Sequence, residues 1–199
     1  RCNTAIAERH TDSYKQFLVD SYVNMSYPDA ISRFKYALQQ THSFRAIHYA
    51  TSALNLEPEN SVELKGVISG KIGDWYLHIK NFDAAREFYL KSVEFLREDE
   101  QLTPSLYISL MKLGDLVLYG MNRQEEAEQI FKNAQEIAQD PVKTVNARVK
   151  LGDALSRQGK IEEARDLYNS AKELLHSSNV SQSTMKQVGD WIDAKFLAL

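Results

Sequence analysis

The chain has 199 residues, 43% of them hydrophobic and 26% charged, so it is long enough to bury a substantial core. With 24 Lys and Arg against 27 Asp and Glu, its net charge of -3 argues against a general affinity for nucleic-acid phosphates. One cysteine, Cys2, excludes an internal disulfide framework, and a reducing compartment is expected. The cytoplasm is the default location, with nuclear or organellar sites left open.

No run of apolar residues is long enough to span a membrane, and the chain begins at Arg1 without the charged and then apolar segment of a signal peptide. We therefore expect a piece of a longer soluble protein that does not insert into membranes. Only 8 Gly and 4 Pro occur, while Ala, Leu, Glu, Lys and Gln are frequent. This composition favours helix along nearly the whole chain.

The first 60 residues carry the weakest pattern. Apolar and aromatic residues recur near helical spacing within 1–26, which predicts an N-terminal helix. Within 27–60, Ala46, Ala50 and Ala53 follow one another in steps of four and three, and Phe34 stands where later units have a glycine. We expect a helical unit here that resembles the later ones.

A repeat dominates the remainder of the chain. An aliphatic residue followed by Gly-Asp recurs with its glycine at positions 73, 114, 152 and 189, at intervals of 41, 38 and 37 residues. A triad of small, aromatic and small residues follows the first three glycines, with steps of four and three that place it on one helical face. These triads are Ala85-Tyr89-Ser92, Ala127-Phe131-Ala134 and Ala164-Tyr168-Ala171.

This pattern predicts pairs of antiparallel helices. The glycine of the first helix allows the aromatic ring of the second to approach closely, where a longer side chain would collide. Turn residues separate the two helices, and Gly159 is suited to the left-handed position that follows a helix. One extra residue lies between Gly114 and Ala127 compared with the other units.

The residues Leu151, Gly152, Leu155, Gly159, Ala164, Tyr168 and Ala171 resemble the tetratricopeptide repeat signature. The resemblance implies an all-α fold, a right-handed superhelical α-solenoid of antiparallel helix pairs. We expect one domain over 1–199, built from an N-terminal helix (1–26), repeats at 27–60, 66–100, 107–140 and 145–178, and a capping helix (182–199).

Catalytic and metal-binding motifs are missing from the sequence. The segment from Gly66 to Ile72 has the wrong spacing for a phosphate-binding loop, and its glycines are better explained as contacts between helices. The five histidines are not paired at ligand spacing, and no nucleophile elbow occurs. We therefore expect no enzyme activity, no metal and no cofactor.

The resemblance also indicates a candidate binding groove, because the first helices of tetratricopeptide arrays line their concave side. The residues that this places in the groove are Val67, Asp74, His78, Ile108, Met111, Asp115, Leu118, Tyr119, Asn146, Val149, Asp153, Arg157, Lys186 and Asp190.

Two interpretations of the aspartates in this set remain open. A column of carboxylates in a groove attracts a peptide or amphipathic helix whose polar side is basic. Alternatively, the aspartates bond to neighbouring helices or pair with Lys112 or Lys150. Under either interpretation, carboxylates at these positions disfavour the chaperone adaptors of the family that clamp carboxylate tails.

We therefore predict a non-enzymatic scaffold or adaptor that binds a partner protein in its concave groove. The alternative is an architectural subunit of a large multiprotein assembly that uses its ridges and ends, such as the apolar segment 196–199. An RNA-binding helical repeat is disfavoured because its inner face would have to be cationic.

Overall fold

A computed structural model describes Ser52 and residues 62–199. The chain divides into two compact units, Arg1–Ser61 and Val62–Leu199, and the second contains nearly all of the described residues. The predicted N-terminal helix (1–26) and first repeat (27–60) lie outside the described residues, apart from Ser52.

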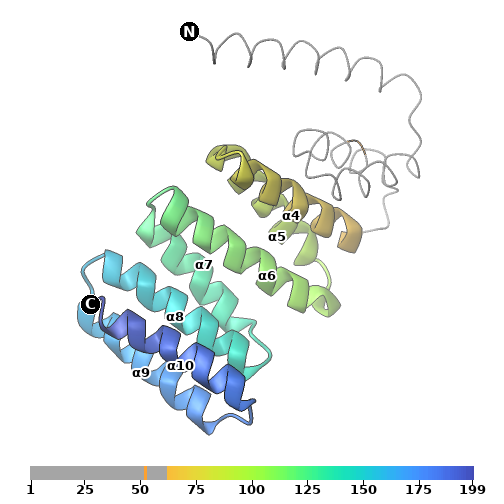
Figure 1. Cartoon of the computed structure of the whole chain (residues 1–199). Coiled ribbons are helices and arrows are strands. Elements are labelled where there is room, and N and C mark those ends of the chain that lie inside the picture. Colours follow the sequence, from red (N-terminus) through yellow and green to blue (C-terminus); the bar gives the residue numbers. More distant parts are fainter. Residues whose placement is uncertain (1–51, 53–61) are drawn as a thin grey trace. The chain divides into compact units, whose positions relative to one another are not determined.

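Residues 62–199 form helices and no strands. The helices α4, α6, α8 and α10 lie on one side of this unit, and α5, α7 and α9 lie on the other (Figure 1). The predicted all-α stack of helix pairs is confirmed, whereas the right-handed twist of the stack stays a prediction. The α-helices are α4 (Val62–His78), α5 (Phe82–Leu96), α6 (Thr103–Asp115), α7 (Gln124–Glu136), α8 (Pro141–Arg157), α9 (Ile161–Ser177) and α10 (Gln182–Phe196), with a 3₁₀ turn η1 (Glu100–Leu102) and a π-helical segment η2 (Leu116–Gly120).

A glycine of the first helix faces an aromatic ring of the second helix in each complete pair. A Cβ atom added to Gly73 would lie 2.7 Å from the ring of Tyr89, and one added to Gly152 would collide with Tyr168. The third pair of this kind is Gly114 with Phe131, and all three rings are at most 1% exposed. The close approach predicted from the sequence is therefore confirmed.

Each turn within a helix pair contains one residue in the left-handed backbone region. Gly159 has φ 80°, which confirms its predicted role, and Lys80 (φ 60°) and Asn122 (φ 55°) occupy the corresponding places in the other two turns. After Lys80 and Gly159, the next amide donates to the carbonyl five residues earlier, at 2.9 and 3.0 Å. This bond closes the helix end in the manner of a Schellman motif.

The extra residue of the third predicted repeat is accommodated inside its first helix. The segment η2 continues α6 as a π-helix, which holds one more residue per turn than an α-helix. An inserted residue rotates the following side chains by about 100° around the helix axis. As a result Leu118 is fully buried, whereas Tyr119 is 42% exposed and takes the outward position that Leu77 holds in α4.

Small polar residues join the first two complete pairs. The Ser92 hydroxyl donates to the Gly66 carbonyl at 2.7 Å and lies 2.9 Å from the Ser109 hydroxyl. A Cβ added to Gly70 would lie 3.2 Å from the same Ser92 oxygen. Gly66 and Gly70 are therefore contact positions between helices. This is the interpretation that the sequence favoured over a phosphate-binding loop.

We expect Gly152→Ala to lower the free energy of unfolding by about 1–3 kcal/mol, because the added methyl group overpacks the Tyr168 ring. Gly189→Ala is the matched control. A Cβ at Gly189 meets no atom within 4 Å, so this change should raise stability by about 0.5–1 kcal/mol through helix propensity alone. Urea denaturation followed by circular dichroism measures both. Equal losses in the two variants would contradict the glycine–aromatic contact.

The buried carboxylate of Glu128 on α7 accepts hydrogen bonds from the turn between α8 and α9. The Glu128 side chain is 10% exposed and accepts hydrogen bonds from Lys132 at 2.6 Å, Gln158 at 2.8 Å and Lys160 at 3.2 Å. These donors, Lys132 above all, lower the pKa of Glu128 from 4.5 to about 2. Gln158 and Lys160 belong to the turn between α8 and α9, so the carboxylate connects two units.

The depressed pKa of Glu128 predicts a pH dependence of stability. Because the folded-state pKa lies below the unfolded value, the stabilisation is complete above pH 4.5 and disappears as the pH falls towards about 2. Glu128→Gln should cost about 2 kcal/mol at pH 7 and progressively less below pH 4.5. Thermal melts of both proteins between pH 7 and 3 test this, and a difference that does not vary with pH would contradict it.

Candidate functional site

The surface made by α4, α6 and α8, with α10 beside them, is called the first-helix face below. Six large hydrophobic side chains of the described residues are exposed, and four of them lie on this face. These four are Val67 (41%), Leu77 (38%), Ile108 (52%) and Tyr119 (42%). Val67 and Ile108 each precede the glycine of their unit by six residues, so the exposed positions repeat from one helix to the next.

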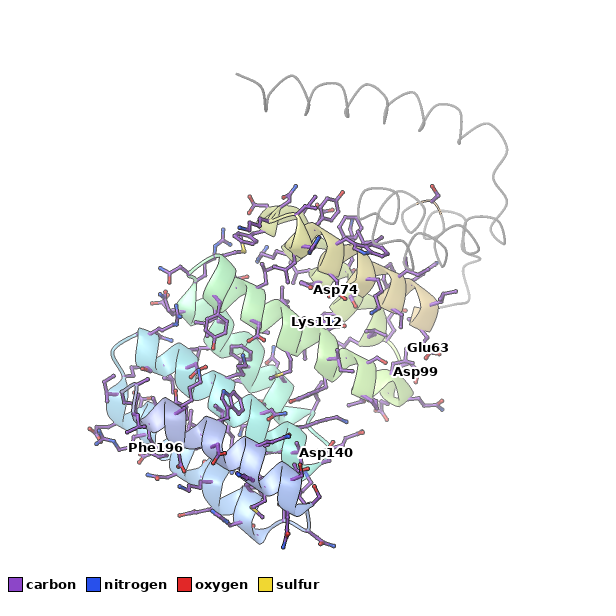
Figure 2. All side chains as sticks on the ribbon, in the orientation of Figure 1. Glu63, Asp74, Asp99, Lys112, Asp140 and Phe196 are labelled. Carbon is purple, nitrogen blue, oxygen red and sulfur yellow. The ribbon has the colours of Figure 1, made fainter. Side chains whose placement is uncertain are left out.

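An Asp–Lys ladder connects the first helices. Asp74 of α4 and Lys112 of α6 lie opposite one another in Figure 2. Each aspartate directly follows the glycine of its unit, and each lysine belongs to the next first helix. The three ion pairs, all with N···O distances of 2.7 Å, are Asp74 with Lys112, Asp115 with Lys150, and Asp153 with Lys195. For these three aspartates the second interpretation is therefore correct: their carboxylates pair with lysines of the neighbouring first helix in the same chain.

Tyrosine hydroxyls donate hydrogen bonds to two of these three carboxylates. Tyr89 donates to Asp74 and Tyr168 donates to Asp153, both at 2.8 Å. Asp153 is 6% exposed and also accepts from Tyr119 at 2.5 Å. Burial, and next the hydrogen bond to an aspartate, raises the pKa of Tyr89, Tyr119 and Tyr168. These hydroxyls therefore stay protonated as donors at neutral pH.

Tyr119 is the centre of a cluster of aromatic and charged groups on the first-helix face. The Lys150 ammonium and the Arg157 guanidinium each lie 4.9 Å from the centre of its ring. Lys150 also pairs with Asp115, whereas Arg157 is exposed and makes no ion pair within residues 62–199. The cluster therefore presents an aromatic ring and an available cation side by side.

Three residues predicted to line the groove are not available to a partner, and these predictions were wrong. Leu118 is fully buried because η2 shifts the outward position to Tyr119. Val149 is fully buried because its position, three residues before the glycine, corresponds to Gly70, which faces neighbouring helices. Asp153 is buried under Tyr119, Tyr168 and Lys195.

The other predicted residues remain at the surface. Val67, His78, Ile108, Tyr119, Arg157, Lys186 and Asp190 are exposed, and Asp74, Met111, Asp115 and Asn146 are partly exposed. Asp190 does not join the ladder, and it makes no hydrogen bond or ion pair with the described residues. The expectation of an acidic groove is therefore not supported, because the ladder lysines offset the other aspartates.

Sequence reasoning treated the lysines only as one alternative, although a signal for them exists. A lysine stands two residues before the glycine in each of the three complete units, at Lys71, Lys112 and Lys150, while the fourth has Gln187. The pattern Lys-aliphatic-Gly-Asp therefore carries both halves of a ladder between neighbouring helices.

This arrangement defines a helical-repeat protein built from stacked helix pairs. Residues 146–174 match the tetratricopeptide repeat family, which confirms the resemblance seen in the sequence. This segment spans most of α8 and α9, the pair held together by Gly152 and Tyr168.

Solved structures share the fold. RapI in its apo form is similar with a TM-score of 0.72 and 15% identity, covering 94% of this chain and 54% of RapI. This chain thus spans about half the length of RapI. BtubC from P. vanneervenii is similar with a TM-score of 0.64 and 17% identity, covering 87% of this chain and 76% of BtubC. No curated protein sequence gives a significant match.

Two other kinds of feature are absent from the described residues. None of their helices combines the length and apolar character needed to cross a membrane. No group of three or more His, Cys, Asp or Glu side chains among them is placed to hold a metal ion.

Replacing Asp153 with alanine should lower the free energy of unfolding by about 2–4 kcal/mol, because two tyrosine hydroxyls and the Lys195 ammonium lose their acceptor. Asp190→Ala, the matched change on α10, should alter stability by less than about 0.5 kcal/mol. Denaturant titration distinguishes them. A small effect at Asp153 would show that its contacts contribute little.

Proposed function

We propose that the chain is a protein-interaction module that takes a peptide or amphipathic helix of a partner along its first-helix face. The observation that carries this proposal is that four of the six exposed large hydrophobic side chains of the described residues lie on this face. Exposed apolar side chains that repeat along one surface are typical of binding sites. Helical repeats of this type are typically non-catalytic scaffolds.

Apolar burial supplies most of the proposed affinity. Covering Ile108, which is 52% exposed, together with Val67 would remove two aliphatic side chains from water, each contributing about 1 kcal/mol. Tyr119 offers a larger surface that its hydrogen bond to Asp153 already holds in place. Aromatic anchors that are fixed before binding lose little side-chain entropy when the partner arrives.

Charge selects the polar side of the partner. One of the two interpretations of the sequence left the four aspartates free and favoured a basic partner. Asp74, Asp115 and Asp153 instead pair with lysines, whereas Arg157 is exposed beside the Tyr119 ring. A carboxylate near Arg157 therefore fits this part of the face better than a cation does.

A second candidate function is supported by the end of the stack. Leu197 is 91% exposed, and several apolar side chains of α10 are partly exposed. An architectural subunit that joins its neighbours through such an end would use α10 rather than the first-helix face. The two functions predict different sensitive residues.

The proposal predicts which partners depend on Ile108. Proteins retained from a lysate of the source organism by the immobilised chain should be lost with Ile108→Ser, and reduced about tenfold with Arg157→Ala. Leu90→Ser is the matched control, because Leu90 is 39% exposed but lies on α5. Quantitative mass spectrometry of the eluates is the measurement. Equal losses with Ile108→Ser and Leu90→Ser would contradict the first-helix face.

A further inference from the structure

The two layers of helices seen in Figure 1 differ in charge. Among the second helices, α7 and α9 each have four acidic side chains, against one and two Lys or Arg. Among the first helices, α8 has four Lys or Arg and one acidic side chain. Positive charge is therefore concentrated at α8 on the first-helix face, while the other side of the stack is acidic.

Arg157 is the basic side chain of α8 that remains available to a ligand. Lys143 and Lys150 are in ion pairs with N···O distances of 3.0 and 2.7 Å, and Arg148 donates a hydrogen bond to a backbone carbonyl at 3.1 Å. Arg157, in the last turn of α8, is exposed and makes no ion pair or hydrogen bond with the described residues.

The Tyr119 ring holds the Arg157 guanidinium in place. The guanidinium carbon lies over the ring, 4.9 Å from its centre, and this contact leaves the N–H groups at the guanidinium edge free. The ring is fixed in turn, because its hydroxyl donates to Asp153, which also accepts from Tyr168 and pairs with Lys195. Little ordering is therefore needed when a ligand binds at Arg157.

The π-helical segment η2 is the reason that this ring reaches the surface. It buries Leu118 completely and leaves Tyr119 42% exposed beside Arg157. Turns of π-helix are rare and occur frequently at functional sites. The backbone of α6 and the charge of α8 are separate observations, and both identify the same place on the first-helix face. We call the pair of side chains the Tyr119–Arg157 site.

The charge around this site fits a single carboxylate. Lys150 and Arg157 contribute two positive charges, and Asp115, which pairs with Lys150, contributes one negative charge. The charge of Asp153 is balanced by Lys195. One positive charge therefore remains, which one carboxylate neutralises, whereas a phosphate group carries nearly two negative charges at neutral pH.

We propose that the Tyr119–Arg157 site binds one glutamate or aspartate side chain of a partner's amphipathic helix. The carboxylate accepts two N–H groups of Arg157, and a large apolar side chain three or four positions away in the partner covers the exposed part of the Tyr119 ring. The inference rests on the proposed function, because it specifies the partner that the first-helix face takes.

Selection from a library of short random peptides, with the full 199-residue chain as bait, tests this. The peptides are displayed through their C-termini, so side chains supply the only carboxylates. We expect enriched peptides to share an acidic residue with a large apolar residue three or four positions away. With Arg157→Glu as bait, a basic residue should be enriched in place of the acidic one.

Arg97→Glu is the matched control, because Arg97 at the end of α5 is also exposed and makes no ion pair with the described residues. The two variants change the net charge equally, so a general effect of charge would appear in both. With Arg97→Glu as bait, the preference for an acidic residue should be unchanged. Circular dichroism establishes that both variants are folded.

An enriched peptide then measures the strength of the contact by fluorescence anisotropy. Replacing its acidic residue with the corresponding amide should weaken binding to the unaltered chain by about tenfold. The same replacement should have no further effect on an Arg157→Ala chain, because the two groups interact with each other.

Several results would overturn the proposal. Enriched peptides without an acidic preference, or the same preference with Arg157→Glu as with the unaltered chain, would do so. Tighter binding of a peptide with phosphoserine in place of the acidic residue would assign the site to a phosphate group. Peptides that depend on Ile108 but not on Arg157 would overturn this site and leave the proposed function intact, whereas the absence of any enriched peptide would contradict both.

Discussion

The contact between a glycine and an aromatic ring is the constraint on which the rest of the stack depends. Gly73, Gly114 and Gly152 each bring a first helix so close to its second helix that an added methyl group would overlap the ring. The rings are fully buried and fill the space between the helices, so the pairs cannot slide or separate without opening cavities. The spacing of these pairs then determines where the lysines of one first helix meet the aspartates of the previous one.

The sequence alone was sufficient for the helix pairs, and it was less informative about their surface. Gly152 and Tyr168 identify their own contact, because a residue without a side chain on one helix leaves room for a ring at the matching place on its neighbour. The direction in which each side chain points was harder to infer. Both Leu118 and Tyr119 were expected in the groove, but only Tyr119 is exposed. One inserted residue can be absorbed as a loop or as a π-turn, and sequence spacing does not distinguish the two.

The fate of the aspartates shows a second limit of sequence reasoning. A carboxylate at a predicted groove looks the same in the sequence whether it awaits a ligand or already has a partner. The pairs of Asp74 with Lys112 and Asp115 with Lys150 join residues 38 and 35 positions apart, and only the packing of neighbouring units brings them together. Asp190 has no such partner because no first helix follows α10 among the described residues, and Lys195 of α10 pairs with Asp153 of the previous unit.

The unequal burial of the ladder makes the stack respond unevenly to ionic strength. Asp74 and Lys112 are 30% and 39% exposed, so dissolved ions reach that pair and screen it. Asp153 is only 6% exposed and is surrounded by hydroxyl donors, so salt barely reaches its pair with Lys195. Added electrolyte would therefore weaken the contact of Asp74 with Lys112 between α4 and α6 more than the contact of Asp153 with Lys195 between α8 and α10.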